Sequence, residues 1–250
     1  MPAAPAPARG RRPAPEAPGA TLARVARRVV ACERCPRLRA HCREVARVRR
    51  RAYRDQVYWG RPVPGFGDPA ARLVLVGLAP AAHGGNRTGR IFTGDRSGDW
   101  LYGALFRAGF ANQPTATHRG DGLRLAGAYV TAAGRCAPPG NRPSPEELEN
   151  CRPYLAAELA ALDRARVVVA LGGVAWDAVL RVWAEAGHAL PRPRPRLGHG
   201  AEFLPASGLP VLLGSYHPSQ QNTLTRRLTQ PMFDAVFARA RELLGARRIR

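Results

Sequence analysis

Four short runs of apolar residues recur through the middle of the chain. They are nearly continuous rather than alternating with polar residues, which is typical of strands buried on both faces of a sheet. The runs are residues 72–78 (RLVLVGL), 127–133 (GAYVTAA), 166–173 (RVVVALGG) and 210–217 (PVLLGSYH). The pattern therefore predicts four buried strands.

Segments with a helical spacing of apolar positions separate and follow these runs. One of them begins with SPEE, in which Ser144 fits an N-cap, Pro145 the first helical position and Glu147 the partner in a capping box. The expected helices span residues 97–110, 144–162, 174–187 and 231–244. Strands that alternate with helices predict an α/β fold, with a central, mostly parallel four-stranded sheet in three α/β/α layers.

The first twenty residues, MPAAPAPARGRRPAPEAPGA, are rich in Pro and Ala. This composition predicts a disordered tail over residues 1–20 and a single folded domain over residues 21–250. The tail lacks the apolar run of a secretory signal, and no stretch of about twenty apolar residues follows it. We therefore expect a cytoplasmic protein with no membrane span.

The chain of 250 residues carries 39 basic and 18 acidic side chains, a formal net charge of +21. Such a surplus favours a polyanionic partner such as DNA, because phosphate contacts supply much of the affinity of nucleic-acid-binding proteins. A GC-rich coding bias is the alternative explanation. Every basic residue is arginine and none is lysine, which excludes a Walker-type phosphate site and a Schiff base on a side-chain amine.

Five cysteines without an export signal argue against a set of disulfides and for a metal site or buried thiols. Cys32 and Cys35 form a C-x2-C pair, a spacing that places two thiolates in one turn, whereas Cys136 and Cys151 lie far downstream. Four thiolates suit either a 4Fe-4S cluster or structural zinc. On spacing alone, Cys42 could replace one member of the downstream pair.

Polar loops follow the predicted strands, at the sheet edge where open α/β proteins bind ligands. In the first loop, GLAPAAHGGNRTGRIFTGD, Asp95 is either a backbone cap or a side chain that faces a ligand. Phe92 is either a core residue or a stacking platform. His217 ends the last strand, which Pro218 prevents from continuing. These residue types predict the functional site at this edge of the sheet.

The order of the motifs resembles the uracil-DNA glycosylase superfamily, and most closely its iron–sulfur family 5, the UDGb type. The resemblance covers Ala31 to Leu244 and includes C-x2-C, GLAPAAHG, FTGD, GRCAPPGNRP, a second distant cysteine and HPS. It implies that Cys42 is a spare thiol and that a 4Fe-4S cluster is held by Cys32, Cys35, Cys136 and Cys151.

The same resemblance implies the residues of an active site. Asp95 would be the catalytic carboxylate that stabilises the sugar cation and orients water. His217 would be the second catalytic residue and would donate a hydrogen bond to the departing base. The substrate-binding residues would be Phe92, stacked on the flipped base, Asn141, and two members of the first motif, Gly77 and Ala79.

A chain of this family would be a DNA repair glycosylase. It would hydrolyse the N-glycosidic bond of uracil and other deaminated bases in double-stranded or single-stranded DNA, leave an abasic site for base excision repair, and act as a monomer. Ala132 stands where family 4 has an Asn, so we expect broad specificity, and the lack of lysine predicts a monofunctional enzyme. The alternative is a noncatalytic DNA-binding protein with a structural four-cysteine metal site.

Overall fold

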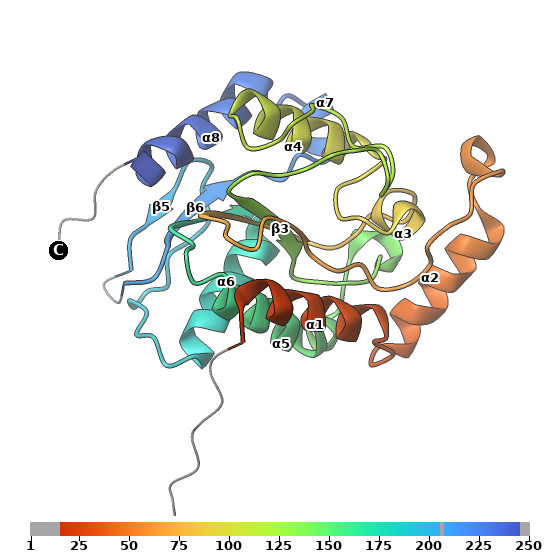
Figure 1. Ribbon diagram of the computed structural model, residues 1–250, viewed down its shortest axis with the longest axis horizontal. Helices are drawn as coiled ribbons and strands as arrows, with labels where there is room; N and C mark the ends of the chain where they lie inside the picture. The colour runs from red at the N-terminus through yellow and green to blue at the C-terminus, as the bar shows by residue number, and fades with distance from the viewer. Residues whose placement is uncertain (1–15, 206–207, 246–250) are drawn as a thin grey trace, which may run out of the picture.

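A six-stranded sheet forms the centre of the molecule (Figure 1). The structure is a computed structural model and describes residues 16–205 and 208–245. Along the sheet the strands follow the order β1-β3-β2-β4-β6-β5, and the four inner strands pair in parallel. The strands are β1 (Phe66–Gly67), β2 (Leu73–Gly77), β3 (Ala128–Ala132), β4 (Val167–Leu171), β5 (Glu202–Phe203) and β6 (Val211–Ser215).

The predicted α/β class is confirmed, but the expected number of strands is wrong. The four predicted runs form β2, β3, β4 and β6, and every residue of β2, β3 and β4 is buried. The short strands β1 and β5 add an antiparallel edge on each side, paired with β3 and β6. A two-residue strand has no periodicity of its own, so its place depends on the strand beside it.

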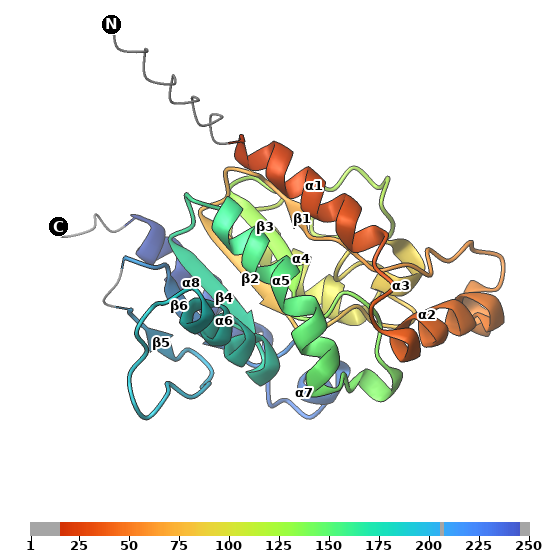
Figure 2. The same ribbon diagram turned by 90° about the horizontal axis from the view of Figure 1, so that it is seen from below.

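Helices cover both faces of the sheet, as the three-layer prediction requires (Figures 1 and 2). Helices α1, α5 and α6 cover one face, where Val74 and Val168 pack among residues of these helices. Helices α4 and α8 cover the other face, where Leu75 and Val169 pack against them. The five helices are α1 (Pro18–Val30), α4 (Arg96–Arg107), α5 (Pro145–Ala161), α6 (Gly173–Glu185) and α8 (Gln230–Gly245).

The first helix begins inside the segment that was expected to be a disordered tail. Helix α1 starts at Pro18, and its residues Leu22, Val25 and Val29 are buried at helical spacing. Residues 1–15 of the predicted tail lie outside the described residues. In the described part of the chain, no helix is both long enough and apolar enough to cross a membrane.

The capping box predicted from SPEE is confirmed. The Glu147 amide donates to Ser144 Oγ at 3.2 Å, and the Ser144 amide donates to Glu147 Oε2 at 2.7 Å. Glu147 also accepts two hydrogen bonds from Arg37 of helix α2 (Pro36–Val48). The start of α5 is thereby joined to α2, and each of these helices carries a cysteine.

The order of the strands places the functional edge. The chain passes from β2 to β3 through α4 on one face, and from β3 to β4 through α5 on the other. The direction of winding therefore reverses between β2 and β4, and such a switch point forms a crevice outside the carboxyl ends of the strands. Short helices α3 (Gly85–Thr88) and α7 (Gln220–Leu224) follow the carboxyl ends of β2 and β6.

Candidate active site

Three of the predicted site residues meet at the carboxyl ends of β2 and β6. The rings of Phe92 and His217 lie 5.7 Å apart between centroids, with their planes 31° from parallel. Phe92 has a φ of 50°, and its ring covers Gly77, where an added Cβ would lie 2.6 Å from ring carbons. Gly77 therefore provides the space that Phe92 occupies.

Burial sets the protonation state of His217. Loss of hydration lowers the pKa of this imidazole to about 4. The side chain is therefore neutral at pH 7 and carries one N–H group that can donate. The backbone of His217 is held in place by helix α7, because Asn222 Nδ2 of this helix donates to the His217 carbonyl at 2.9 Å.

Asp95 combines the two roles that the sequence left open. It is the N-cap of α4, because the Gly98 amide donates to its Oδ1 at 3.0 Å. Its Oδ2 lies against Gly84, where any side chain would overlap it. Asp95 also lines a cavity of about 650 Å³ at the protein surface. A carboxylate in this position caps a helix with one oxygen and meets a cavity that a ligand can enter.

The pKa of Asp95 is raised above its usual value. Burial is the main cause, while the Gly98 amide opposes it. The neighbouring Asp99 raises this pKa further, and Arg87 lowers it. The carboxyl group is thus held where its charged form is poorly solvated, which is a common property of catalytic acids and bases.

The other two predicted substrate-binding residues are not joined to this group. Ala79 is partly buried and lies near Gly134 on the loop after β3. Asn141 is exposed at the end of the short helix Pro139–Asn141 and has a φ of 57°. In the described part of the chain, its side chain makes no hydrogen bond. The roles of Ala79 and Asn141 stay predictions.

Two arginines that sequence reasoning passed over hold the loop that carries Phe92 and Asp95. Arg90 makes a bidentate ion pair with Asp121 at 2.9 and 2.6 Å, and both side chains are buried. Arg87 donates to the carbonyls of His83 and Gly94, each at 2.7 Å. Both arginines stand in the NRTGR stretch of the loop. Asp121, the partner of Arg90, lies in another segment, whereas Arg87 binds carbonyls of its own loop, and the motif alone reveals neither contact.

The four predicted cluster ligands lie near one another. Burial raises the pKa of the Cys151 thiol to about 11, and the nearby thiols of Cys35 and Cys32 raise it further. The pKa of Cys136 is raised by its hydrogen bond with Cys42, by burial and by Cys151. All five cysteines are free thiols.

The surroundings of these thiols fit a cluster held by thiolates, although the side chains are not arranged around a single ion. Asn150 Nδ2 lies 3.6 Å from Cys35 Sγ, and the backbone N–H of Arg135 donates to Cys151. Such N–H donors are typical partners of cluster sulfur atoms. Among the described residues, no group of three or more His, Cys, Asp or Glu side chains is placed to hold one metal ion.

The spare thiol, Cys42, lies beside Cys136. It is fully buried, and its Sγ lies 3.6 Å from the Ala137 carbonyl. The hydrogen bond with Cys136 lowers the pKa of Cys42. Cys42 is thus a buried neighbour of the predicted ligand Cys136.

The chain belongs to the uracil DNA glycosylase superfamily, whose family model matches residues 64–241. It is 54% identical to a type-5 uracil-DNA glycosylase of Mycobacterium bovis over 215 residues, which cover 86% of this chain and 78% of the relative. It is 51% identical to a type-5 uracil-DNA glycosylase of Thermus thermophilus over 217 residues, or 87% of this chain and 95% of the relative.

A type-4 relative is more distant. The type-4 uracil-DNA glycosylase of Pyrobaculum aerophilum is 31% identical over 164 residues, which cover 65% of this chain and 74% of the relative. The type-5 enzyme of the same organism is 48% identical over 213 residues, or 85% and 89%. The resemblance to family 5 is therefore confirmed.

Proposed function

We propose that this chain is a DNA repair glycosylase that hydrolyses the N-glycosidic bond of uracil in DNA and leaves an abasic site. The observation that carries the proposal is the group of Gly77, Phe92 and His217 at the switch point of the sheet, with Asp95 on the same loop as Phe92. The similarity to type-5 uracil-DNA glycosylases supports it. It also favours an enzyme over a noncatalytic DNA-binding protein.

The proposed reaction uses the site residues as follows. The target nucleotide leaves the base stack, because its sugar carbon is inaccessible within a duplex. Phe92 stacks on the extruded base. The neutral His217 donates its N–H to the pyrimidine oxygen O2, where negative charge collects as the bond breaks. The Asp95 carboxylate stabilises the positive sugar and orients the attacking water.

The proposed enzyme is monofunctional. A glycosylase that also cuts the strand needs an amine that forms a Schiff base with the opened sugar. The sequence contains no lysine, so no side chain can supply that amine. Water is then the nucleophile, and the product is an intact strand with an abasic site.

The proposed substrate range includes other deaminated bases, such as hypoxanthine. Ala132 ends β3 and is buried, and Leu78 and Ala79 follow the end of β2. None of these side chains can make the paired hydrogen bonds that would select uracil over another base.

We propose that the enzyme acts as a monomer on both double-stranded and single-stranded DNA.

Release of the free base tests the proposal directly. The purified protein is incubated with duplexes that contain one uracil opposite G or A, or one hypoxanthine, and the freed base is quantified by mass spectrometry. We expect uracil from both pairs and a measurable amount of hypoxanthine. Release of uracil alone would contradict the broad substrate range, and release of no base would contradict the glycosylase.

The proposed cofactor is a 4Fe-4S cluster on Cys32, Cys35, Cys136 and Cys151. Such a cluster would tie the turn between α1 and α2 to the loop after β3 and to α5, since these segments carry the four thiols. Protein purified without oxygen should be brown, with about four irons per chain. Cys151→Ser should lose the iron and Cys42→Ser should keep it. Colourless protein with stoichiometric zinc would contradict the iron assignment.

A further inference from the structure

A basic segment projects from the body of the molecule after helix α2 (orange in Figure 1). We call this segment, residues 49–58, the arm. Residues 49–57 contain four arginines and a single acid. Arg50, Arg51 and Arg54 are exposed, and in the described part of the chain none of their side chains forms an ion pair.

The fourth arginine gives the arm its shape. Arg49 has a φ of 58°, which turns the chain away from the end of α2. Its side chain donates to the carbonyls of Ala46 and, at 2.7 Å, Arg54. The Arg50 amide donates to Tyr58 Oη at 3.3 Å. The arm is therefore a folded element, and its three exposed arginines extend from a fixed backbone.

Arg87 joins the arm to the loop of Asp95. Its guanidinium lies 4.0 Å from the centre of the Tyr53 ring and donates to Gln56 Oε1, both in the arm. The same guanidinium donates to the carbonyl of Gly94, the residue before Asp95. Arg87 is only 8% exposed. The position of the arm is thus set relative to the proposed catalytic carboxylate.

The arm also forms one wall of the cavity at Asp95. Tyr53, Gln56 and Val57 line this cavity together with Asp95 and His118. Val57 is 87% exposed at the rim. A nucleotide bound in the cavity at Asp95 would therefore lie beside the arm, with its flanking phosphates within reach of the arm.

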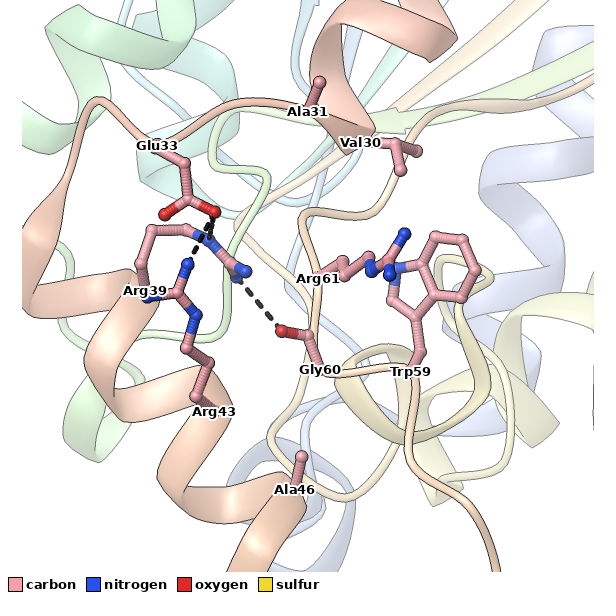
Figure 3. Close-up of a pocket in the computed structure, with 9 residues that line it drawn as sticks. All are labelled: Val30, Ala31, Glu33, Arg39, Arg43, Ala46, Trp59, Gly60 and Arg61. Carbon is pink, nitrogen blue, oxygen red and sulfur yellow. Dashed lines mark hydrogen bonds and ion pairs between the residues drawn. The ribbon is translucent and has the colours of Figure 1, made fainter.

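Two further hollows continue from this cavity along the base of the arm. The first shares Val57 and Arg87 with the Asp95 cavity and is also lined by Trp59 and Arg61. The second, shown in Figure 3, shares Trp59 and Arg61 with the first and reaches Arg39 and Arg43 of α2.

The charges in the second hollow are partly compensated. Glu33 binds both Arg39 and Arg43, whereas Arg61 lies over the Trp59 ring at 5.9 Å (Figure 3). Arg119 lies over the same ring at 4.8 Å. In the part of the chain that the structure describes, Arg61 and Arg119 have no acidic partner. Uncompensated positive charge thus extends from the arm past Trp59.

We propose that the arm is a DNA-binding surface, in which Arg50, Arg51 and Arg54 contact phosphates that flank the nucleotide in the Asp95 cavity. This assignment rests on the proposed function for the nature of the polyanion. Arginine–phosphate contacts release counterions, so each contact adds to the salt dependence of binding. They carry no base information and set the position of the strand.

The test compares two triple variants that lose the same charge. Arg50→Gln/Arg51→Gln/Arg54→Gln removes the arm arginines. Arg27→Gln/Arg124→Gln/Arg164→Gln removes three exposed arginines on other elements. The probe is a short fluorescent duplex with a single 2′-fluorodeoxyuridine, which resists cleavage, and its anisotropy gives Kd across ~50–200 mM salt. Circular dichroism and thermal unfolding confirm that both variants are folded.

We expect the arm variant to bind about 10-fold or more weakly, with a log–log salt slope smaller by about 2–3 units, near 0.9 for each lost phosphate contact. The control variant should keep the slope of the parent protein within about one unit. Arg50→Lys/Arg51→Lys/Arg54→Lys should recover most of the affinity and the salt slope, because either cation neutralises a phosphate and releases its counterion.

Three results would overturn the arm assignment: an arm variant with the parent slope, an equal loss in both triple variants, or no recovery with lysine. Uracil release by the parent protein is measured separately. Release of uracil together with an unaltered slope in the arm variant would reject the arm and leave the glycosylase intact. No release, with the slope reduced only in the arm variant, would reject the glycosylase alone.

Discussion

Glu158 is buried and Asp95 is half-buried, and the oxygen atoms of the two carboxyl groups are used differently. Glu158 is 1% exposed, and both of its oxygens are occupied: Arg135 donates to each of them, at 3.1 and 2.5 Å, and Tyr129 and Thr131 donate one hydrogen bond apiece. Asp95 accepts the Gly98 amide on Oδ1 and, in the described part of the chain, has no ion-pair partner.

The number of fixed hydrogen-bond partners distinguishes a structural carboxylate from one that can bind a ligand. A buried charge whose hydrogen-bonding capacity is filled by fixed partners rigidifies its surroundings and has nothing left for a ligand. A carboxylate at a cavity with a raised pKa and an oxygen outside the cap can take up a new interaction. Glu158 therefore has a structural role in the core, and this contrast supports the catalytic role proposed for Asp95.

The largest expected effect is on stability, at Glu158. Glu158→Gln leaves the Arg135 guanidinium buried without its counter-charge, which should lower the free energy of unfolding by about 3–5 kcal/mol. Chemical denaturation measures this change. The control is Glu149→Gln on the same helix, an exposed acid whose loss should cost under about 1 kcal/mol. Equal stabilities of the two variants would remove the structural role given to Glu158.

The next effect is on catalysis, at His217. His217→Ala removes the N–H proposed to stabilise the leaving base, so kcat should fall by about 10²–10³-fold. Binding of uncleaved DNA should change little, because the interaction strengthens only as the bond breaks. His188→Ala, on a partly exposed histidine elsewhere in the chain, is the control. A His217→Ala enzyme with the kcat of the parent would exclude this role.

A smaller effect concerns stability against pH. Burial lowers the pKa of His217 to about 4, whereas the unfolded chain takes up its proton near pH 6.5. Above pH 6.5 both states are neutral and the histidine adds no pH dependence. Between pH 6.5 and 4 only the unfolded state is protonated, so the native protein loses stability as the pH falls.

From pH 7 to pH 5 this histidine should account for about 2 kcal/mol of lost stability. His217→Gln should remove that part of the loss, and denaturation at the two pH values measures it. If parent and variant lose the same stability, His217 is not held neutral by burial.

The sequence predicts the core of the fold better than its periphery. The inner strands are found where continuous apolar runs predict them, because burial on both faces leaves a clear pattern. The start of α1 is missed because Pro18 and its neighbours belong to a Pro/Ala-rich stretch, although Leu22, Val25 and Val29 keep helical spacing. The edge strands β1 and β5 depend on the pairing of distant segments.

Some features of the candidate site can likewise be predicted from the sequence, and others cannot. The meeting of Gly77, Phe92 and His217 follows from motifs at the ends of predicted strands, since parallel strands bring those ends to one edge. The lowered pKa of His217 does not follow from the motifs, because it results from burial in the folded chain. The contacts of Arg87 do not follow from them either, because they join segments that are distant in the sequence. Arg87, for example, links Tyr53 of the arm to Gly94.

The catalytic role proposed for Asp95 can be measured as the single-turnover rate at which a labelled uracil duplex acquires alkali-sensitive sites. In Asp95→Asn the amide can still cap α4, so the fold and DNA binding should persist. We predict a rate about 10²-fold or more below that of the parent, with Asp99→Asn within about 3-fold of the parent as the control for a neighbouring charge. An Asp95→Asn enzyme that forms abasic sites at the parent rate would contradict a catalytic role for Asp95.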